Sequence, residues 1–251
     1  MYDVSTRKRA LALAAQGRSL NSVSRETGIS RSTIQRWLIR LEPLRRTAPC
    51  VRCQDPRQMP GDQAAYAHLL GLYLGDGHII SKPRQHYLSI TCTASWAGLI
   101  DAAEDAMRKV LPWPSISRLQ RAGGVDVKSY SKHWTCMFPQ HGPGRKHERA
   151  IALEPWQQAI VDEHPWEFIR GLIHSDGCRI TNWTTRLVAG ERQRFEYPRY
   201  CFSNKSADIM RLFTNALDRV GVDWRQMNTC NISIARKASV ALMDTHVGPK
   251  F

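Results

Sequence analysis

Two aspartates with matching neighbours lie one hundred residues apart in this sequence, at Asp76 and Asp176. Each is preceded by a small residue and followed by glycine, and both copies read Gly-x-x-x-small-Asp-Gly. Two carboxylates held close together repel each other, and a divalent cation removes that penalty. Mg²⁺ usually binds one or two carboxylates together with water and phosphate oxygens. The repeated aspartate therefore indicates a divalent-metal site.

The residues before each aspartate have the pattern of a helix with one face of small side chains. Small residues recur at every fourth position in both copies, which lets two helix backbones approach closely. We therefore expect the two helices to pack on each other at the centre of a domain. The small positions are Ala67, Gly71 and Gly75 in the first copy and Gly171 and Ser175 in the second.

The glycine after each aspartate, Gly77 or Gly177, stands where a helix end often needs a positive φ. This predicts that Asp76 and Asp176 lie in the last turns of their helices, where the helix dipole is negative. A carboxylate there is unfavourable by about 0.3–1 kcal/mol unless a positive charge compensates it. One Asp-Gly alone is an ordinary helix end, and it is the second copy on a matching helix that favours a functional site.

The similarity between the two copies continues downstream and predicts a duplicated α+β unit. Each half has the predicted order αββαββα, and we place the halves at 62–150 and 151–251. The elements after the first motif helix are expected at 78–82, 87–93, 96–110, 115–121 and 125–138. Those after the second are expected at 178–183, 200–204, 207–220, 223–228 and 230–236.

Residues 1–41 predict a small all-α helix-turn-helix domain, with helices over 5–16, 19–27 and 31–38. Gly28 supplies the tight turn before the third helix, and Ser30 is a good N-cap for it. This arrangement resembles the small DNA-binding domain of resolvases and invertases.

The third helix of this domain is expected to turn a polar face outward and an apolar face inward. Arginine pairs with guanine edges, glutamine with adenine, and hydroxyl groups with bases or phosphate. The polar face therefore predicts contact with DNA, and a plain three-helix bundle with a solvated basic face is the alternative. The outward residues are Arg31, Ser32, Thr33, Gln35 and Arg36, and the inward residues are Ile34, Trp37 and Leu38.

The chain is strongly basic, with 36 lysines and arginines against 22 aspartates and glutamates and a net charge of +14. In a chain with 42% hydrophobic residues, this excess favours a nucleic-acid partner and argues against a disordered protein. No apolar run is long enough to cross a bilayer, and the first residues lack the apolar stretch of a signal peptide. Seven cysteines do not form an evident disulfide framework, so we expect a reducing bacterial cytoplasm and association with the nucleoid.

Residues 42–61 read as a linker, because they contain four prolines and little hydrophobic periodicity. Within them, Cys50 and Cys53 form a Cys-x-x-Cys pair, which is half of a tetrahedral zinc site. The sequence has no second pair of this kind. A plain pair of linker thiols is therefore the preferred interpretation, and a structural Zn²⁺ is the lesser one.

The two motif helices resemble those of the LAGLIDADG homing endonucleases, which end in an acidic residue followed by glycine. The resemblance covers residues 62–251. It implies that the motif helices form the interface between two halves, whose four-stranded sheets make a pseudo-two-fold saddle over duplex DNA. It also implies that Asp76 and Asp176, with the preceding Gly75 and Ser175, hold catalytic Mg²⁺ or Mn²⁺ at the scissile phosphates.

By the same resemblance, each half has a polar residue near the end of its second strand and a lysine further on. Asn204 fits the polar position in the second half, and Thr93 is the weaker candidate in the first. Lys146 and Lys250 follow similar Gly/Pro segments, 70 and 74 residues after their aspartates. A lysine beside the metal stabilises phosphorane charge or lowers the pKa of the attacking water. The alternative is a basic loop that only touches phosphate.

Polar and basic residues of the predicted strands are expected to face DNA, because such side chains on one face of a sheet suit the major groove. The strand register decides which alternate positions do so. The candidates are Arg118, Gln120, Arg121, Lys128, Lys132, Arg225, Gln226, Asn228, Asn231 and Arg236.

Three functions on this fold remain open. The first is a monomeric, sequence-specific endonuclease that cuts double-stranded DNA with a divalent metal. The second is a transcription regulator that binds DNA without cutting it, which the helix-turn-helix favours and the two retained aspartates disfavour. The third is an RNA-splicing maturase, which the helix-turn-helix disfavours. An enzyme acting on a small molecule is the least favoured interpretation, since the sequence has no glycine-rich cofactor loop or nucleophile motif.

Overall fold

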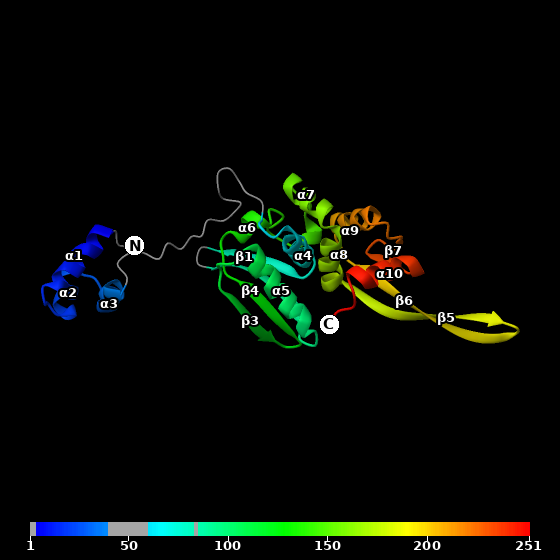
Figure 1. Cartoon of the computed structure of the whole chain (residues 1–251), viewed down its shortest axis with the longest axis horizontal. Coiled ribbons are helices and arrows are strands. Elements are labelled where there is room, and N and C mark those ends of the chain that lie inside the picture. Colours follow the sequence, from blue (N-terminus) through cyan, green and yellow to red (C-terminus); the bar gives the residue numbers. More distant parts are fainter. Residues whose placement is uncertain (1–3, 40–59, 83–84) are drawn as a thin grey trace. The chain divides into compact units, whose positions relative to one another are not determined.

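The computed structural model describes residues 4–39, 60–82 and 85–251 (Figure 1). The chain divides into two compact units, Met1–Pro49 and Cys50–Phe251, and each is described by itself. The predicted linker with Cys50 and Cys53 lies almost wholly outside the described residues, so the zinc interpretation stays a prediction.

The smaller unit contains three helices, α1 (Val4–Ala15), α2 (Leu20–Thr27) and α3 (Arg31–Ile39). They enclose a core made by Ala10, Val23, Ile29, Ile34 and Trp37. The predicted turn is confirmed, since Gly28 has a φ of 69° and ends α2 in the left-handed conformation.

The start of α3 has the predicted cap, because the hydroxyl of Ser30 accepts the backbone N–H of Thr33 at 3.3 Å. One core prediction for this helix is wrong. Leu38 is 55% exposed, because the inward face of α3 is already filled by Ile34 and Trp37.

The larger unit is built from two similar halves, each with a four-stranded antiparallel sheet. The strand orders are β1-β2-β4-β3 and β5-β6-β8-β7, which repeat the same connectivity. The first half contains α4 (Gln63–Leu74), β1 (Gly77–Lys82), β2 (Gln85–Thr93), α5 (Ala97–Val110), β3 (Ile116–Arg121), β4 (Gly124–Ser129) and α6 (Trp134–Met137), followed by a 3-10 turn at Lys146–Glu148. The second contains α7 (Pro155–Glu163), α8 (Pro165–Asp176), β5 (Gly177–Val188), β6 (Glu191–Ser203), α9 (Ala207–Arg219), β7 (Arg225–Asn228), β8 (Asn231–Ile234) and α10 (Lys237–His246).

The duplicated α+β prediction is therefore confirmed, with corrections to element lengths. The strand expected over 125–138 ends at Ser129, and α6 follows it. Strands β5 and β6 are much longer than expected, and they form a two-stranded arm that extends beyond the rest of the second sheet (Figure 1). Helix α7 was not among the predicted elements.

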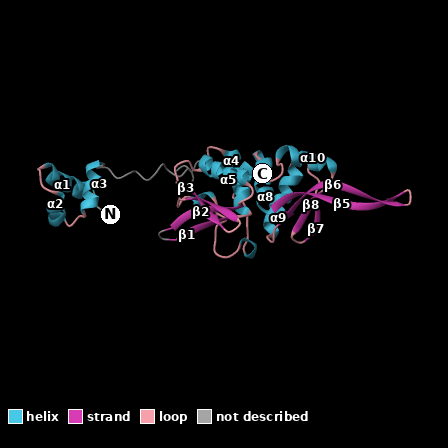
Figure 2. Cartoon of the chain, turned by 90° about the horizontal axis from the view of Figure 1, so that it is seen from below, coloured by secondary structure: helices cyan, strands magenta, loops and turns pink. Residues whose placement is uncertain are grey.

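Helices α4 and α8 pack on each other at the centre of the unit, with one sheet on either side of the pair (Figures 1 and 2). A Cβ built on Gly71 would lie 2.6 Å from the carbonyl oxygen of Phe168. A Cβ on Gly171 would lie 2.2 Å from that of His68 and 2.9 Å from Cα of Gly71. The small faces therefore bring the two backbones into direct contact, as the four-residue spacing predicts.

The glycines after the aspartates have a different role from the predicted one. Gly177 has a φ of −105°, and Gly77 is not among the glycines with positive φ. Both residues begin strands. A Cβ on Gly77 would lie 2.5 Å from Cα of Tyr73, and one on Gly177 would lie 2.8 Å from Cα of Ile173. These positions need glycine because the strand starts directly against the last helical turn.

Two histidines, His68 of α4 and His174 of α8, are buried in the helix interface with their ring centroids 6.3 Å apart. Burial and the charge of Arg170 lower the pKa of both imidazoles, that of His68 to about 3 and that of His174 to about 4. Nε2 of His68 has no hydrogen-bond partner among the described residues. Both rings are therefore neutral in the folded protein at neutral pH.

We expect acid to destabilise the larger unit through these histidines. Because each folded pKa lies below the unfolded value of 6.5, stability is present above pH 6.5 and is lost as the pH falls toward 4. In that range each histidine lowers the free energy of unfolding by about 1.4 kcal/mol for each pH unit that the pH falls. Urea unfolding at pH 7 and pH 5 measures the effect, and His68→Gln/His174→Gln should reduce the difference. An unchanged difference in that variant would show that other groups are responsible.

None of the helices in the described ranges is long and apolar enough to span a membrane.

Candidate active site

The two predicted aspartates lie at the adjoining ends of α4 and α8. Asp176 is the last residue of α8, whereas Asp76 stands two residues beyond the end of α4 at Leu74. A Cβ on Gly75 would lie 2.1 Å from Oγ of Ser175 and 3.2 Å from Cγ of Asp176, so the two helix ends touch. The close packing of the small faces thus brings the repeated acidic positions to one place.

The second half supplies a polar partner for its aspartate. Nδ2 of Asn204 donates a hydrogen bond of 2.6 Å to Oδ2 of Asp176. Oδ1 of Asn204 accepts the backbone N–H of Ser206 at 2.8 Å, which fixes the orientation of the amide. Thr93 is exposed at the end of β2, and among the described residues the Asp76 carboxylate accepts no hydrogen bond from it or from any other group. The two halves of the site are therefore unequal.

The two predicted lysines lie at the ends of the motif helices. Nζ of Lys146 donates to the carbonyl oxygens of Leu74 at 3.0 Å and Gly75 at 2.7 Å, and also to that of Tyr73. Nζ of Lys250 donates to the carbonyl oxygen of Ser175 at 2.8 Å. Each ammonium group therefore neutralises the negative end of one helix dipole, where the aspartates would otherwise be least favourable.

Desolvation dominates the ionisation of this cluster. Burial, together with the charge of Asp76, raises the pKa of Asp176 to about 6, against the opposing effect of Asn204 and both lysines. Burial also raises the pKa of Asp76, which Lys250 and Lys146 oppose. Burial lowers the pKa of Lys146 to about 8, and it lowers that of Lys250 as well, although the aspartates favour both charged forms. The site therefore holds two carboxylates that lack sufficient compensation for their charge.

A cleft of about 380 Å³ opens beside Asp176 and contains groups from both halves. Three of its basic residues, Arg145, His147 and Lys205, were not predicted from the sequence, because they lie in loops and turns with no periodicity. Their closeness to Lys146 and Asn204 along the chain is the only sequence signal that points to them. The cleft is lined by Leu74, Gly75, Arg145, Lys146, His147, Asp176, Ser203, Asn204 and Lys205.

The donor set at the helix ends suits a hard divalent cation. Carboxylate, carbonyl and amide oxygens are ligands for Mg²⁺ and Mn²⁺, and a cation would lower the raised pKa of Asp176. Within the described ranges, no three His, Cys, Asp or Glu side chains form a metal-binding group. A metal bound here would therefore take its other ligands from backbone carbonyls, water and the phosphate of a substrate.

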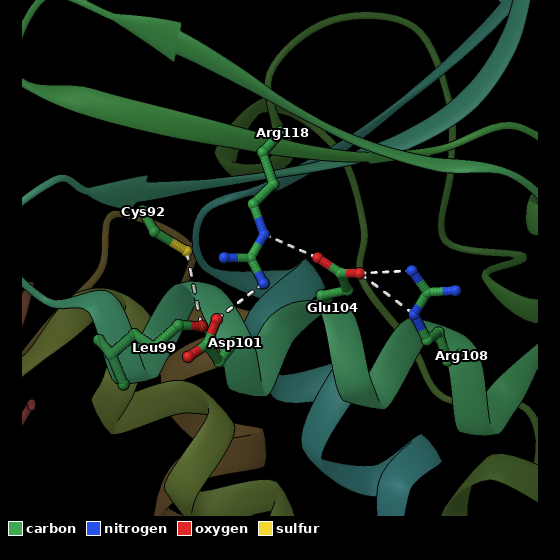
Figure 3. A network of polar contacts seen from close by, with 6 residues as sticks. All are labelled: Cys92, Leu99, Asp101, Glu104, Arg108 and Arg118. Carbon is green, nitrogen blue, oxygen red and sulfur yellow. Dashed lines mark hydrogen bonds and ion pairs between the residues drawn. The ribbon is translucent and has the colours of Figure 1, made fainter.

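The register of the first sheet places two of the predicted DNA-contact residues on its helix-facing side. Arg118 is opposite Val127 and Gln120 is opposite Val125, so both share the face that packs against α5. Arg118 donates hydrogen bonds of 2.7 Å to Asp101 and to Glu104 of α5 (Figure 3). These two residues therefore lie on the helix-covered face rather than on the open one.

The open face of the first sheet carries Arg121 and Lys128. Both form ion pairs with the buried Asp126, and Nζ of Lys128 lies 3.5 Å from Oδ2 of that residue. Nζ of Lys128 also lies 5.2 Å from the ring centroid of Tyr87. Lys132 is exposed beyond the end of β4. Arg121, Lys128 and Lys132 thus stay candidates for contact with a ligand.

The second sheet divides its candidates in the same way. Arg225 is opposite Ser233 on the open face, whereas Gln226 is opposite the buried Ile232 and lies on the helix-covered face. Asn228 and Asn231 are paired on the open face, where Nδ2 of Asn231 donates to Oδ1 of Asn228 at 2.9 Å. Arg236 directly precedes α10 and forms an ion pair with Asp223 at 2.9 Å.

The predicted recognition face of the smaller unit is present on α3. Arg31, Ser32, Gln35 and Arg36 are exposed, and Thr33 is half-buried. Arg31 donates to Oδ1 of Asn21 at 2.9 Å, which fixes its guanidinium on α2.

Comparison with known proteins gives two kinds of similarity. Residues 1–43 match the family model of the homeodomain-like domain. A search of curated proteins found no match. Among solved structures, the chain is similar to mesophilic variants of the homing endonuclease I-DmoI, with 12% identity, a TM-score of 0.49 and coverage of 74% of this chain and 96% of that one.

Two further solved structures are DNA complexes. One is the LAGLIDADG meganuclease I-AabMI bound to uncleaved DNA, with 10% identity, a TM-score of 0.46 and coverage of 72% of this chain and 83% of that one. The other is the LAGLIDADG homing endonuclease I-SmaMI bound to cleaved DNA, with 9% identity, a TM-score of 0.45 and coverage of 70% and 79%. These three solved structures are homing endonucleases, and each match covers 70–74% of this chain.

Proposed function

We propose that this chain is a sequence-specific endonuclease that hydrolyses phosphodiesters of double-stranded DNA with a divalent metal. One observation carries the proposal. The close contact of α4 and α8 places Asp76 and Asp176 together, with Lys146 and Lys250 at the same helix ends. A fold gains no stability from this arrangement, because burial raises the pKa of both carboxylates and the charge of Asp76 raises that of Asp176 further. Functional sites are where such unfavourable groups are retained.

The residues of the site would divide the work of phosphodiester hydrolysis. Mg²⁺ or Mn²⁺, held by Asp76 and Asp176 with the carbonyl oxygens of Gly75 and Ser175, would supply Lewis-acid activation of water and of the phosphate. Asn204 holds one oxygen of the Asp176 carboxylate and so orients the other.

The proposal assigns to the ammonium groups of Lys146 and Lys250 the stabilisation of the charge that develops on a phosphorane. In the structure they contact the carbonyl oxygens of Gly75 and Ser175, which the proposal assigns to the metal. Binding of metal and DNA would therefore require each lysine to turn from the carbonyl toward the phosphate.

DNA binding is proposed for both units. The net charge of +14 favours a polyanion, and the open sheet faces present Arg121, Lys128, Arg225 and the asparagine pair Asn228 and Asn231. The smaller unit would add contacts through the exposed face of α3. One chain supplies both aspartates, so a monomer is sufficient. We propose the domain limits 1–41, 42–61, 62–150 and 151–251 on the same basis.

Selection from a randomised duplex library tests the proposal. The purified chain is incubated with the library and Mg²⁺ or Mn²⁺, and the DNA ends that form are sequenced. We expect discrete metal-dependent ends for the wild type and none for Asp76→Asn/Asp176→Asn, which should still bind the same duplex.

A DNA-binding regulator is the second candidate, and the homeodomain-like match at residues 1–43 favours it. The same library experiment separates the two functions. Recovery of one duplex sequence with no new ends, for the wild type and the double variant alike, would support the regulator and contradict the nuclease.

A further inference from the structure

Two cysteines of the second sheet face each other at the base of the β5–β6 arm. Cys178 on β5 is the direct cross-strand partner of Cys201 on β6. Both are free thiols, Cys178 being exposed and Cys201 half-buried. Burial and the neighbouring Cys178 thiol raise the pKa of Cys201, and the charge of Arg199 opposes them.

The fold itself does not require thiols at these positions. In the first sheet the equivalent pair, two residues after Asp76, is His78 opposite Ser89. The duplicated architecture therefore accommodates other residues here, and the pair is a feature of the second half alone. The proposed nuclease chemistry uses neither sulfur.

The backbone geometry of such a pair suits a disulfide. Directly opposed residues of antiparallel strands have Cα atoms about 4.5–5.5 Å apart. Disulfides join residues whose Cα atoms are about 4.4–6.8 Å apart. The Cα spacing typical of such a pair therefore lies within the range that a disulfide spans.

We propose that Cys178 and Cys201 form a reversible cross-strand disulfide, a redox modification site at the base of the β5–β6 arm. With glutathione disulfide as the oxidant, the sulfur of the exposed Cys178 bonds to one glutathione sulfur and releases the other as glutathione. The sulfur of Cys201 then displaces the second glutathione. Two protein thiols are oxidised and one glutathione disulfide is reduced to two glutathiones, which carry the two thiol protons.

The position of the bond gives it a structural effect on the site. Cys178 lies two residues after Asp176 and Cys201 three residues before Asn204, whose amide holds the Asp176 carboxylate at 2.6 Å. A bond between the strands would close a loop that contains the whole arm, Arg179 to Tyr200. It would tie together the two strands that carry this hydrogen-bonded pair.

Peptide mapping tests the proposal without any assay of DNA cleavage, so its failure is distinct from failure of the proposed function. The full chain is equilibrated in buffers of increasing glutathione disulfide to glutathione ratio, alkylated and digested with trypsin. We expect peptides 171–179 and 200–205 to become linked, with the thiols of Cys178 and Cys201 no longer open to alkylation. The linked species should disappear when dithiothreitol is added. Both peptides fully alkylated in the most oxidising buffer, or Cys178 linked to another cysteine, would overturn the proposal.

Matched variants assign the bond. Cys50→Ser/Cys53→Ser removes the other closely spaced pair and should leave the linked peptides unchanged. Cys201→Ser should abolish them and leave a glutathione adduct on Cys178, whereas Cys230→Ser should have no effect. Oxidation should raise the Tm of the wild type by several degrees, because the bond closes a loop in the unfolded chain. The Tm of Cys178→Ser should not change. An equal rise in Cys178→Ser would contradict the assignment.

Discussion

Gly171→Ala is expected to destabilise the larger unit by about 3 kcal/mol or more, although alanine is the better helix former by about 1 kcal/mol. The new methyl group would meet the carbonyl oxygen of His68 at 2.2 Å and the Cα of Gly71 at 2.9 Å. Both are backbone atoms of α4, so a change of rotamer brings no relief. The two helices must separate, and the aspartates at their ends separate with them. Urea unfolding measures the loss of stability.

A contact on the same interface supplies the control. A Cβ on Gly75 would meet Oγ and Cβ of Ser175, which are side-chain atoms. Gly75→Ala should therefore be destabilising alone and recover in Gly75→Ala/Ser175→Gly, whereas no side-chain deletion should rescue Gly171→Ala. If Gly171→Ala unfolds at the wild-type urea concentration, the backbone contact between α4 and α8 is not what holds the halves together.

The motif helices could be predicted from the sequence because their pattern is local and repeated. Small residues at every fourth position constrain how two helices pack, and two copies of the same spacing identify the partner. The pairing of α4 with α8, the duplicated order of elements and the polar face of α3 all follow from such patterns.

Other features depend on contacts that a linear pattern does not contain. The length of the β5–β6 arm was missed because its residues alternate without a buried face. Arg118 and Gln120 were assigned to DNA by residue type, but the register pairs them with Val127 and Val125 on the helix-facing side of the sheet. Gly77 was assigned a positive φ, but the position needs glycine because the strand begins directly against Tyr73.

The site was predicted as a set of residues rather than as an arrangement. Asp176, Asn204 and Lys146 all line one cleft, although they come from different elements. That Lys146 and Lys250 cap the ends of α4 and α8 was not predicted, because the contacts span more than seventy residues of chain. The only sequence signal for these lysines was that each follows its aspartate by a similar number of residues.

Asp176→Asn is expected to have opposite effects on activity and stability. Under the proposed function, removal of the carboxylate should lower the cleavage rate by about a thousandfold or more, since a metal ligand is lost. The free energy of unfolding at pH 7 should rise by about 2 kcal/mol, because the folded pKa of about 6 lies above the unfolded value of 3.8. The carboxylate is partly open to solvent, which makes the gain smaller than the pKa difference alone would give. Such a trade of stability for function is common at active sites.

The pH dependence gives the sign of this effect. A carboxyl group with a raised folded pKa contributes stability that is present below pH 3.8 and is lost as the pH rises through 6, so the gain in Asp176→Asn should be full above pH 6 and vanish near pH 4. Asp244 of α10 is the matched control. Its carboxylate accepts hydrogen bonds of 2.6 and 2.9 Å from Arg179, which lower its pKa, so Asp244→Asn should destabilise the protein at pH 7. If Asp176→Asn is instead less stable than the wild type at pH 7, the carboxylate is held by favourable contacts, and the argument that function retains an unfavourable charge there fails.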